Sequence, residues 1–191
     1  MNINLQDHNY FRFSWIDAPL ENIEKYMTKD YFVKNGYRVK HSQNIDNICF
    51  DYNPKIRKAY FVKMTNGIIM IPNLQDGWIT LFHNITSNLK FSGYCFAISS
   101  KNETEPYNCI TYVENGLTKR VCYVMKENKK WIFYEEGEIL FFEDVKNYEN
   151  KFKKDKLDQN TIINYLHKLK IVNNSVLEIQ NNMNILVEHG T

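Results

Sequence analysis

The chain has 191 residues, 43% of them hydrophobic, which is enough for a sizeable buried core and argues against disorder. Its net charge of +2 is smaller than nucleic-acid-binding domains usually carry, and has the wrong sign for an acidic decoy of a basic partner. The first residues show no signal-peptide pattern and the apolar runs are too short to span a membrane, so we expect a soluble, cytoplasmic protein.

The first quarter of the chain predicts strands and one short helix. Residues 10–16 alternate between polar and apolar side chains, as a half-buried strand does. Residues 20–28 place apolar side chains at helical spacing and predict a packing helix. Residues 36–40 predict a brief extended segment, and residues 48–52 predict another strand.

A hairpin and an amphipathic helix are predicted next. Asn66-Gly67 separates apolar runs at residues 59–64 and 68–72, which predicts a hairpin because both central positions of a tight turn need positive φ. Residues 78–88 carry large apolar side chains at helical spacing and predict an amphipathic helix, with Gly93 as its stop signal.

The second half of the chain begins with a predicted meander of strands, rich in tyrosine and phenylalanine, which favour pleated surfaces. Residues 109–113 and 119–125 flank Asn115-Gly116 and predict a second hairpin. The other strands of the meander are predicted at residues 94–99, 131–134 and 138–142.

A helix and a tail follow the meander. Asp158 is predicted to cap a helix whose apolar face lies within residues 162–169, and residues 176–187 predict a final strand or a swapped segment. Together the elements predict an α+β fold, in which an antiparallel sheet of about six to eight strands, built from hairpins and a meander, packs with two or three helices. We expect a single domain over residues 1–191, with residues 1–47 and 172–191 as peripheral parts.

The sequence predicts no metal, no cofactor and no enzymatic activity. Its five histidines are scattered without metal-ligand spacing, and phosphate-binding and nucleophile motifs are missing. The cysteines show no CxxC spacing and are predicted to be buried free thiols. They are Cys49, Cys95, Cys109 and Cys122. One alternative stays open, which is an enzyme of unknown type with a site near His83 and a nearby thiol, Cys95 or Cys109.

Charged residues gather after the last predicted strands. The acidic residues between positions 135 and 144 are interpreted as a solvated hairpin tip and the turn after it. A lysine cluster within residues 146–156 follows and is interleaved with Tyr148 and Phe152. Lysines mixed with aromatic rings can bind single-stranded nucleic acid, so a nucleic-acid-associated regulator is a second alternative. Adjacent acidic and basic runs can also orient a charged protein partner.

Two segments resemble an uncharacterised family of small bacterial proteins. They are GWITLFHNITSNL (residues 77–89) and the segment from KRVCYVMK through WIFYEEGEILFFE to NYLHKL (residues 119–169). Members share a GW-x-x-L-F/Y helix, a KR-V-x-x-V-M-K strand, a W-x-F-Y-x-x-G-x-x-L-x-F-E hairpin and a terminal helix after a K/R-rich turn. Such proteins are similar to the immunity partners of bacterial polymorphic toxins, including those of contact-dependent inhibition systems.

This resemblance implies an immunity protein that binds and neutralises a cognate toxin domain by protein–protein interaction. The many tyrosines and tryptophans suit such a role, because these residues are efficient interface anchors. No membrane partner is expected, and the near-neutral charge argues against nucleic acid. The surface from residue 134 to 154 is predicted to contact the toxin. Its predicted contact residues are Tyr134, Glu135, Glu136, Glu138, Glu143, Asp144, Tyr148, Phe152, Lys153 and Lys154.

Overall fold

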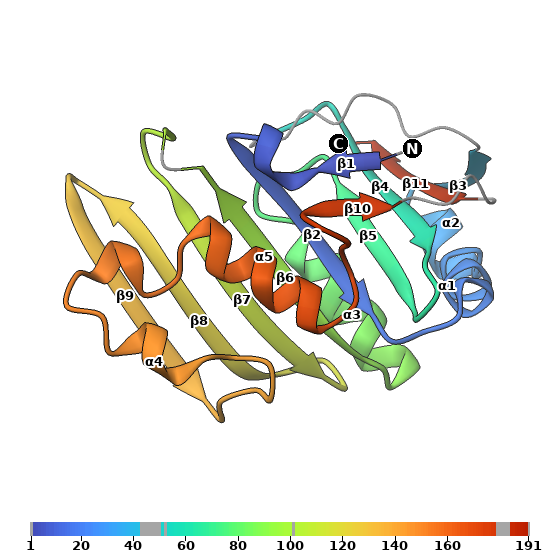
Figure 1. The fold of residues 1–191 in the computed structure, drawn as a ribbon. Coiled ribbons are helices and arrows are strands. Elements are labelled where there is room, and N and C mark those ends of the chain that lie inside the picture. Colours follow the sequence, from blue (N-terminus) through green and yellow to red (C-terminus); the bar gives the residue numbers. More distant parts are fainter. Residues whose placement is uncertain (1, 43–50, 52, 101, 179–183, 191) are drawn as a thin grey trace. The chain divides into compact units, whose positions relative to one another are not determined.

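The computed structural model (Figure 1) describes the chain except for residues 1, 43–50, 52, 101, 179–183 and 191. The described residues form eleven strands in two sheets and five α-helices. The strand pairs are antiparallel, so the predicted α+β class with an antiparallel sheet is confirmed. The predicted counts of strands and helices were too low, because three-residue strands and four- or five-residue helices leave too short a periodic pattern to detect.

The chain divides into two compact units. The first comprises Met1–Phe11, Cys95–Tyr112 and Thr118–Glu178, and the second comprises Arg12–Tyr94, Val113–Leu117 and Ile179–Thr191. The single domain expected over residues 1–191 stays a prediction.

The first unit is built on neighbouring antiparallel strands. They follow the order β6 (Ser92–Ser99), β7 (Tyr107–Glu114), β8 (Leu117–Glu127) and β9 (Lys130–Gly137). Helices α4 (Val145–Tyr148) and α5 (Gln159–Lys168) cover one face of these strands (Figure 1). The smaller elements are the 3-10 helices η1 (Leu5–Asp7) and η2 (Lys153–Asp155) and a two-stranded sheet of β1 (Asn2–Asn4) and β10 (Val176–Glu178).

Most of the predicted elements of the first unit are confirmed. The turn between β7 and β8, which the division assigns to the second unit, has positive φ at both Asn115 and Gly116, as the hairpin prediction requires. Asp158 caps α5 by accepting a hydrogen bond from the Thr161 backbone N–H at 2.8 Å. The strand predicted at residues 138–142 is wrong, because this segment leaves the sheet and forms a turn that buries Phe142.

The neighbouring strands of the second unit are not in chain order. The order is β3 (Tyr37–Ser42), β11 (Asn184–Gly190), β4 (Ile56–Lys63), β5 (Ile68–Pro72) and β2 (Tyr10–Ile16). The unit also contains the helices α1 (Leu20–Met27), α2 (Asp30–Lys34) and α3 (Ile79–Leu89). The prediction of a final strand near the C-terminus is confirmed by β11, which pairs with β3 on one side and with β4 on the other.

The predicted turn and helix-end signals of the second unit are only partly confirmed. The β4–β5 hairpin forms, but within its turn Gly67 has a positive φ of 84° whereas Asn66 does not. Helix α3 ends at Leu89, where the C-cap residue Lys90 with its φ of 59° stops it, so Gly93 is not the stop signal. Gly93 lies in β6, where a Cβ atom would stand 2.5 Å from the carbonyl oxygen of Trp15. The strand predicted at residues 48–52 lies largely outside the described residues.

Candidate partner-binding surface

A buried arginine lies at the centre of the polar contacts in the first unit. Arg120 lies on β8, where Arg120, Cys122 and Val124 alternate with less buried residues and therefore face the layer of α4 and α5. Its side chain is 1% exposed. A guanidinium cannot lose its charge inside a protein, so this position needs acidic partners.

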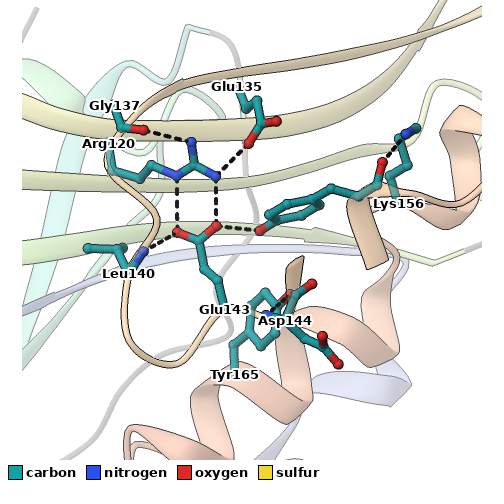
Figure 2. Close-up of polar contacts among 9 residues, drawn as sticks. Arg120, Glu135, Gly137, Leu140, Glu143, Asp144, Lys156 and Tyr165 are labelled. Carbon is teal, nitrogen blue, oxygen red and sulfur yellow. Dashed lines mark hydrogen bonds and ion pairs between the residues drawn. The ribbon is translucent and has the colours of Figure 1, made fainter. Parts of the chain in front are cut away.

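Glu143 is the principal partner of Arg120 (Figure 2). Arg120 donates from Nε and Nη2 to the two carboxylate oxygens of Glu143, at 3.0 and 2.8 Å. This two-point geometry is the strongest that an arginine and a carboxylate can form. Glu143 also accepts hydrogen bonds from the Leu140 backbone N–H at 3.0 Å and the Tyr148 hydroxyl at 2.5 Å. The glutamate thereby ties β8, the segment after β9 and α4 together.

Two further groups accept hydrogen bonds from Arg120. Its Nη2 donates to Glu135 at 2.8 Å, and its Nη1 donates to the carbonyl oxygen of Gly137 at 3.1 Å. Gly137 has φ 89°, and a Cβ atom there would stand 1.9 Å from the carbonyl oxygen of Lys119. Only glycine therefore fits at the point where β9 ends and the chain turns toward Glu143.

The burial of this cluster controls its ionisation. Burial alone lowers the pKa of Arg120, but the hydrogen bonds that Arg120 donates to Glu143 and Glu135 outweigh it and raise that pKa overall. Burial also raises the pKa of Tyr148, and the neighbouring Cys122 and Glu143 raise it further. Burial is the main cause that raises the pKa of the Cys122 thiol to about 12. At neutral pH the cluster thus holds a charged arginine, a neutral phenol and a neutral thiol.

The segment that Glu143 holds presents apolar side chains to solvent. We call residues 138–145 the display segment. Within it Phe142 and Glu143 point inward and are buried, whereas three apolar residues are exposed. Their exposed fractions are 83% for Phe141, 48% for Ile139 and 47% for Val145. Single exposed apolar side chains are ordinary on protein surfaces, whereas several that gather in one region mark a candidate interaction site.

Backbone contacts fix the display segment at several further points. The Glu143 N–H donates to the carbonyl oxygen of Leu140 at 2.9 Å. The Asp144 N–H donates to the hydroxyl of Tyr165 on α5 at 2.9 Å, and Lys168 Nζ donates to the carbonyl oxygen of Phe142 at 2.9 Å. Helix α5 therefore holds the same segment from one side while Arg120 holds it from the other (Figure 2).

The structure separates the ten predicted contact residues into two groups. Glu143 and Tyr148 are buried and hydrogen-bonded, so their side chains are not available at the surface. Glu135 is partly exposed but its carboxylate is paired with Arg120. The remaining predicted residues are exposed. They are Tyr134, Glu136, Glu138, Asp144, Phe152, Lys153 and Lys154.

Sequence reasoning missed Arg120, Ile139 and Phe141. One signal for Arg120 was available, because it shares the alternate positions of β8 with Cys122 and Val124, and an arginine on a buried face implies a buried acid. Arg120, Gly137, Leu140 and Glu143 all fall within the residues that carry the family resemblance.

The lysines of the cluster lie in two different environments. Lys156 donates to the carbonyl oxygen of Tyr148, and its ammonium lies 5.1 Å from the centre of the Phe133 ring. By contrast, Lys151 and Lys154 are exposed and lie 5.8 and 6.0 Å from the ring centre of Phe152, which is 60% exposed. Phe152 is therefore an exposed aromatic residue with two ammonium groups beside its ring.

The other predicted features have structural explanations. In the second unit, His83 Nδ1 lies 3.0 Å from the Gly116 carbonyl oxygen and joins α3 to the β7–β8 turn. Cys95, Cys109 and Cys122 are buried thiols as predicted, whereas Cys49 lies outside the described residues. Among the described residues no group of histidine, cysteine or acidic side chains could hold a metal ion. None of the described helices is long and apolar enough to cross a membrane.

Comparison with known proteins adds no relative from which a function could be transferred. No protein-family model, no curated protein and no solved structure matches this chain.

Proposed function

We propose that the protein is an immunity protein that binds and neutralises a cognate bacterial toxin domain through the display segment. The observation that carries the proposal is the exposure of Phe141 on a backbone that is held by the buried Arg120–Glu143 pair. The family resemblance supplies the class of partner. The predicted contact residues Glu138 and Asp144 lie in the same segment and are exposed, as a polar rim around an apolar anchor would be.

Preorganisation is the physical reason for this reading. A flexible loop loses conformational entropy when it binds, and this loss reduces affinity. The display segment has already been ordered on folding by four hydrogen bonds to the Glu143 carboxylate. A partner that covers Phe141, Ile139 and Val145 gains apolar burial without ordering the segment again.

A nucleic-acid-associated role is the second candidate, and it has one observation in its favour. The exposed Phe152 ring with Lys151 and Lys154 beside it combines a stacking surface with positive charge. Binding to single-stranded nucleic acid normally uses successive aromatic platforms along a basic groove. Across residues 145–156, Phe152 is the single aromatic ring that is exposed, so we rank this candidate second.

Coexpression with a candidate toxin domain encoded beside this gene tests the proposal. We expect the wild-type chain to relieve growth arrest and to elute with the toxin domain from a sizing column. Phe141→Ala should weaken the complex by about 2 kcal/mol or more, because a central aromatic anchor is lost. Leu117→Ala is the matched control, since Leu117 is 62% exposed but lies on the β7–β8 hairpin. Unrelieved arrest without any complex would reject the proposal, and equal effects of the two substitutions would reject the display segment as the contact site.

A further inference from the structure

The connection after the display segment carries a localised positive charge. Residues 145–156 contain five lysines and two acidic residues, which gives this stretch a net charge of +3 although the whole chain carries only +2. Four of the lysines are exposed, and they are Lys146, Lys151, Lys153 and Lys154. The charge is therefore concentrated where the chain passes from α4 to η2.

The exposed lysines surround an apolar centre. The ammonium groups of Lys151 and Lys154 lie within 6.0 Å of the Phe152 ring centre, and this ring is exposed. Lys156 is excluded from this set because its ammonium donates to the Tyr148 carbonyl oxygen. The arrangement suits an apolar patch on a partner that covers the ring, with carboxylates at the rim of the patch to pair with the ammonium groups.

We propose that this Lys151–Phe152–Lys154 site docks an acidic protein surface, and hence that the toxin domain presents aspartates or glutamates around an apolar spot. This inference rests on the proposed function and adds the chemistry of the partner. An acidic protein fits better than nucleic acid for two reasons. The site offers one stacking ring, and Glu149 and Asp155, which lie among the lysines, would repel a continuous phosphate backbone.

Charge reversal with a matched control tests the inference. The probe is the purified toxin domain encoded next to the gene, and binding is measured by calorimetry at 50 and 300 mM salt. Lys151→Glu/Lys154→Glu should weaken binding at least tenfold at 50 mM salt, and the difference from the wild type should shrink at 300 mM because salt screens exposed charges. Lys25→Glu/Lys34→Glu makes the same charge change at exposed lysines of the second unit and should stay within about twofold of the wild type.

Three results would overturn the inference, and they separate it from the proposed function. If Phe141→Ala weakens binding but Lys151→Glu/Lys154→Glu does not, the proposed function stands and the acidic docking site falls. If a 20-nucleotide single-stranded DNA binds more tightly than the toxin domain and the double substitution abolishes this binding, the site belongs to nucleic acid. If the wild-type chain and the toxin domain form no complex, both proposals fail.

Discussion

Each of the two units holds a glutamate paired with a cationic side chain, but the cations differ greatly in exposure. In the first unit Arg120 and Glu143 have side chains that are 1% and 0% exposed. In the second unit Glu188 lies 2.5 Å from Lys40 and 3.8 Å from Lys58, and the side chains of Glu188, Lys58 and Lys40 are 14%, 32% and 55% exposed. The buried pair gives up hydration that the exposed pair keeps, so its loss should cost far more.

The comparison also separates two roles for charge. Glu188 joins lysines of β3 and β4, strands that already pair with its own strand through the backbone. Glu143 holds a segment that has left the sheet and has no ladder of backbone hydrogen bonds to keep it in place. The ion pairs of Glu188 therefore add little to strands that the sheet already holds in place. The ion pair of Glu143 instead helps to fix the conformation of a segment that lies outside the sheet.

The largest effect is expected from Glu143→Gln. This substitution keeps the shape of the side chain but leaves Arg120 buried with only the partly exposed Glu135 as its acidic partner. We expect the free energy of unfolding, measured by urea titration, to fall by about 3–5 kcal/mol. The double variant Arg120→Met/Glu143→Leu should recover much of this loss, because it removes both buried charges. A loss below about 1 kcal/mol for Glu143→Gln would contradict the comparison.

A smaller effect is expected from Tyr148→Phe. The substitution removes the hydroxyl that donates to Glu143 at 2.5 Å and leaves the buried ring in place. We expect a loss of about 2 kcal/mol in urea titration, because hydrogen bonds to charged groups are the stronger ones. Tyr134→Phe is the control, since Tyr134 donates to Glu136 at the surface, and we expect no measurable change there. Equal effects would show that burial does not decide the strength of these bonds.

Alkaline pH should affect the buried cluster through Cys122. Its folded pKa of about 12 lies above the ordinary value of 9.0, so above pH 9 the unfolded chain releases a proton that the folded chain keeps. Stability should therefore be unaffected by this group below pH 9 and fall between pH 9 and 12, by at most about 1.4 kcal/mol per pH unit. Urea titrations across this range should show a shallower decline for Cys122→Ala than for the wild type. Parallel declines would mean that the thiol does not contribute.

The smallest effect is expected from Lys40→Gln. Glu188 keeps Lys58 as a neighbour, and Lys40 itself is well exposed. The free energy of unfolding should change by less than about 1 kcal/mol, and 1 M salt should reduce the difference further. A change as large as that of Glu143→Gln would remove the distinction between the two pairs.

Helices and strands were predictable from the sequence where the spacing of apolar residues matched a single buried face of the element. Residues 10–16 form β2 at the predicted bounds, and the Asn115-Gly116 turn has the predicted backbone. Where such a prediction was wrong, tertiary contacts determined the structure of the segment. The apolar run at residues 138–142 has strand composition, yet the hydrogen bonds to Glu143 draw it out of the sheet.

For the candidate surface, the sequence indicated the charged and aromatic composition but not which side chains are exposed. The charged and aromatic character of residues 134–156 pointed to this part of the chain. The sequence does not show which side chains of Phe141-Phe142-Glu143 face inward, because alternation indicates a face only while the chain stays in a strand. Once the segment turns, Phe142 and Glu143 are neighbours that are both buried, and Phe141 is left outside.

The position of β11 between β3 and β4 has a consequence for biosynthesis. Val187 faces Val39 on one side and Ala59 on the other, so its partners leave the ribosome about 130 residues or more before it does. Until Asn184–Gly190 has emerged, β3 and β4 lack the strand that separates them and each has an unpaired edge. We expect the nascent chain to need shielding from aggregation during translation, and this part of the sheet to close late.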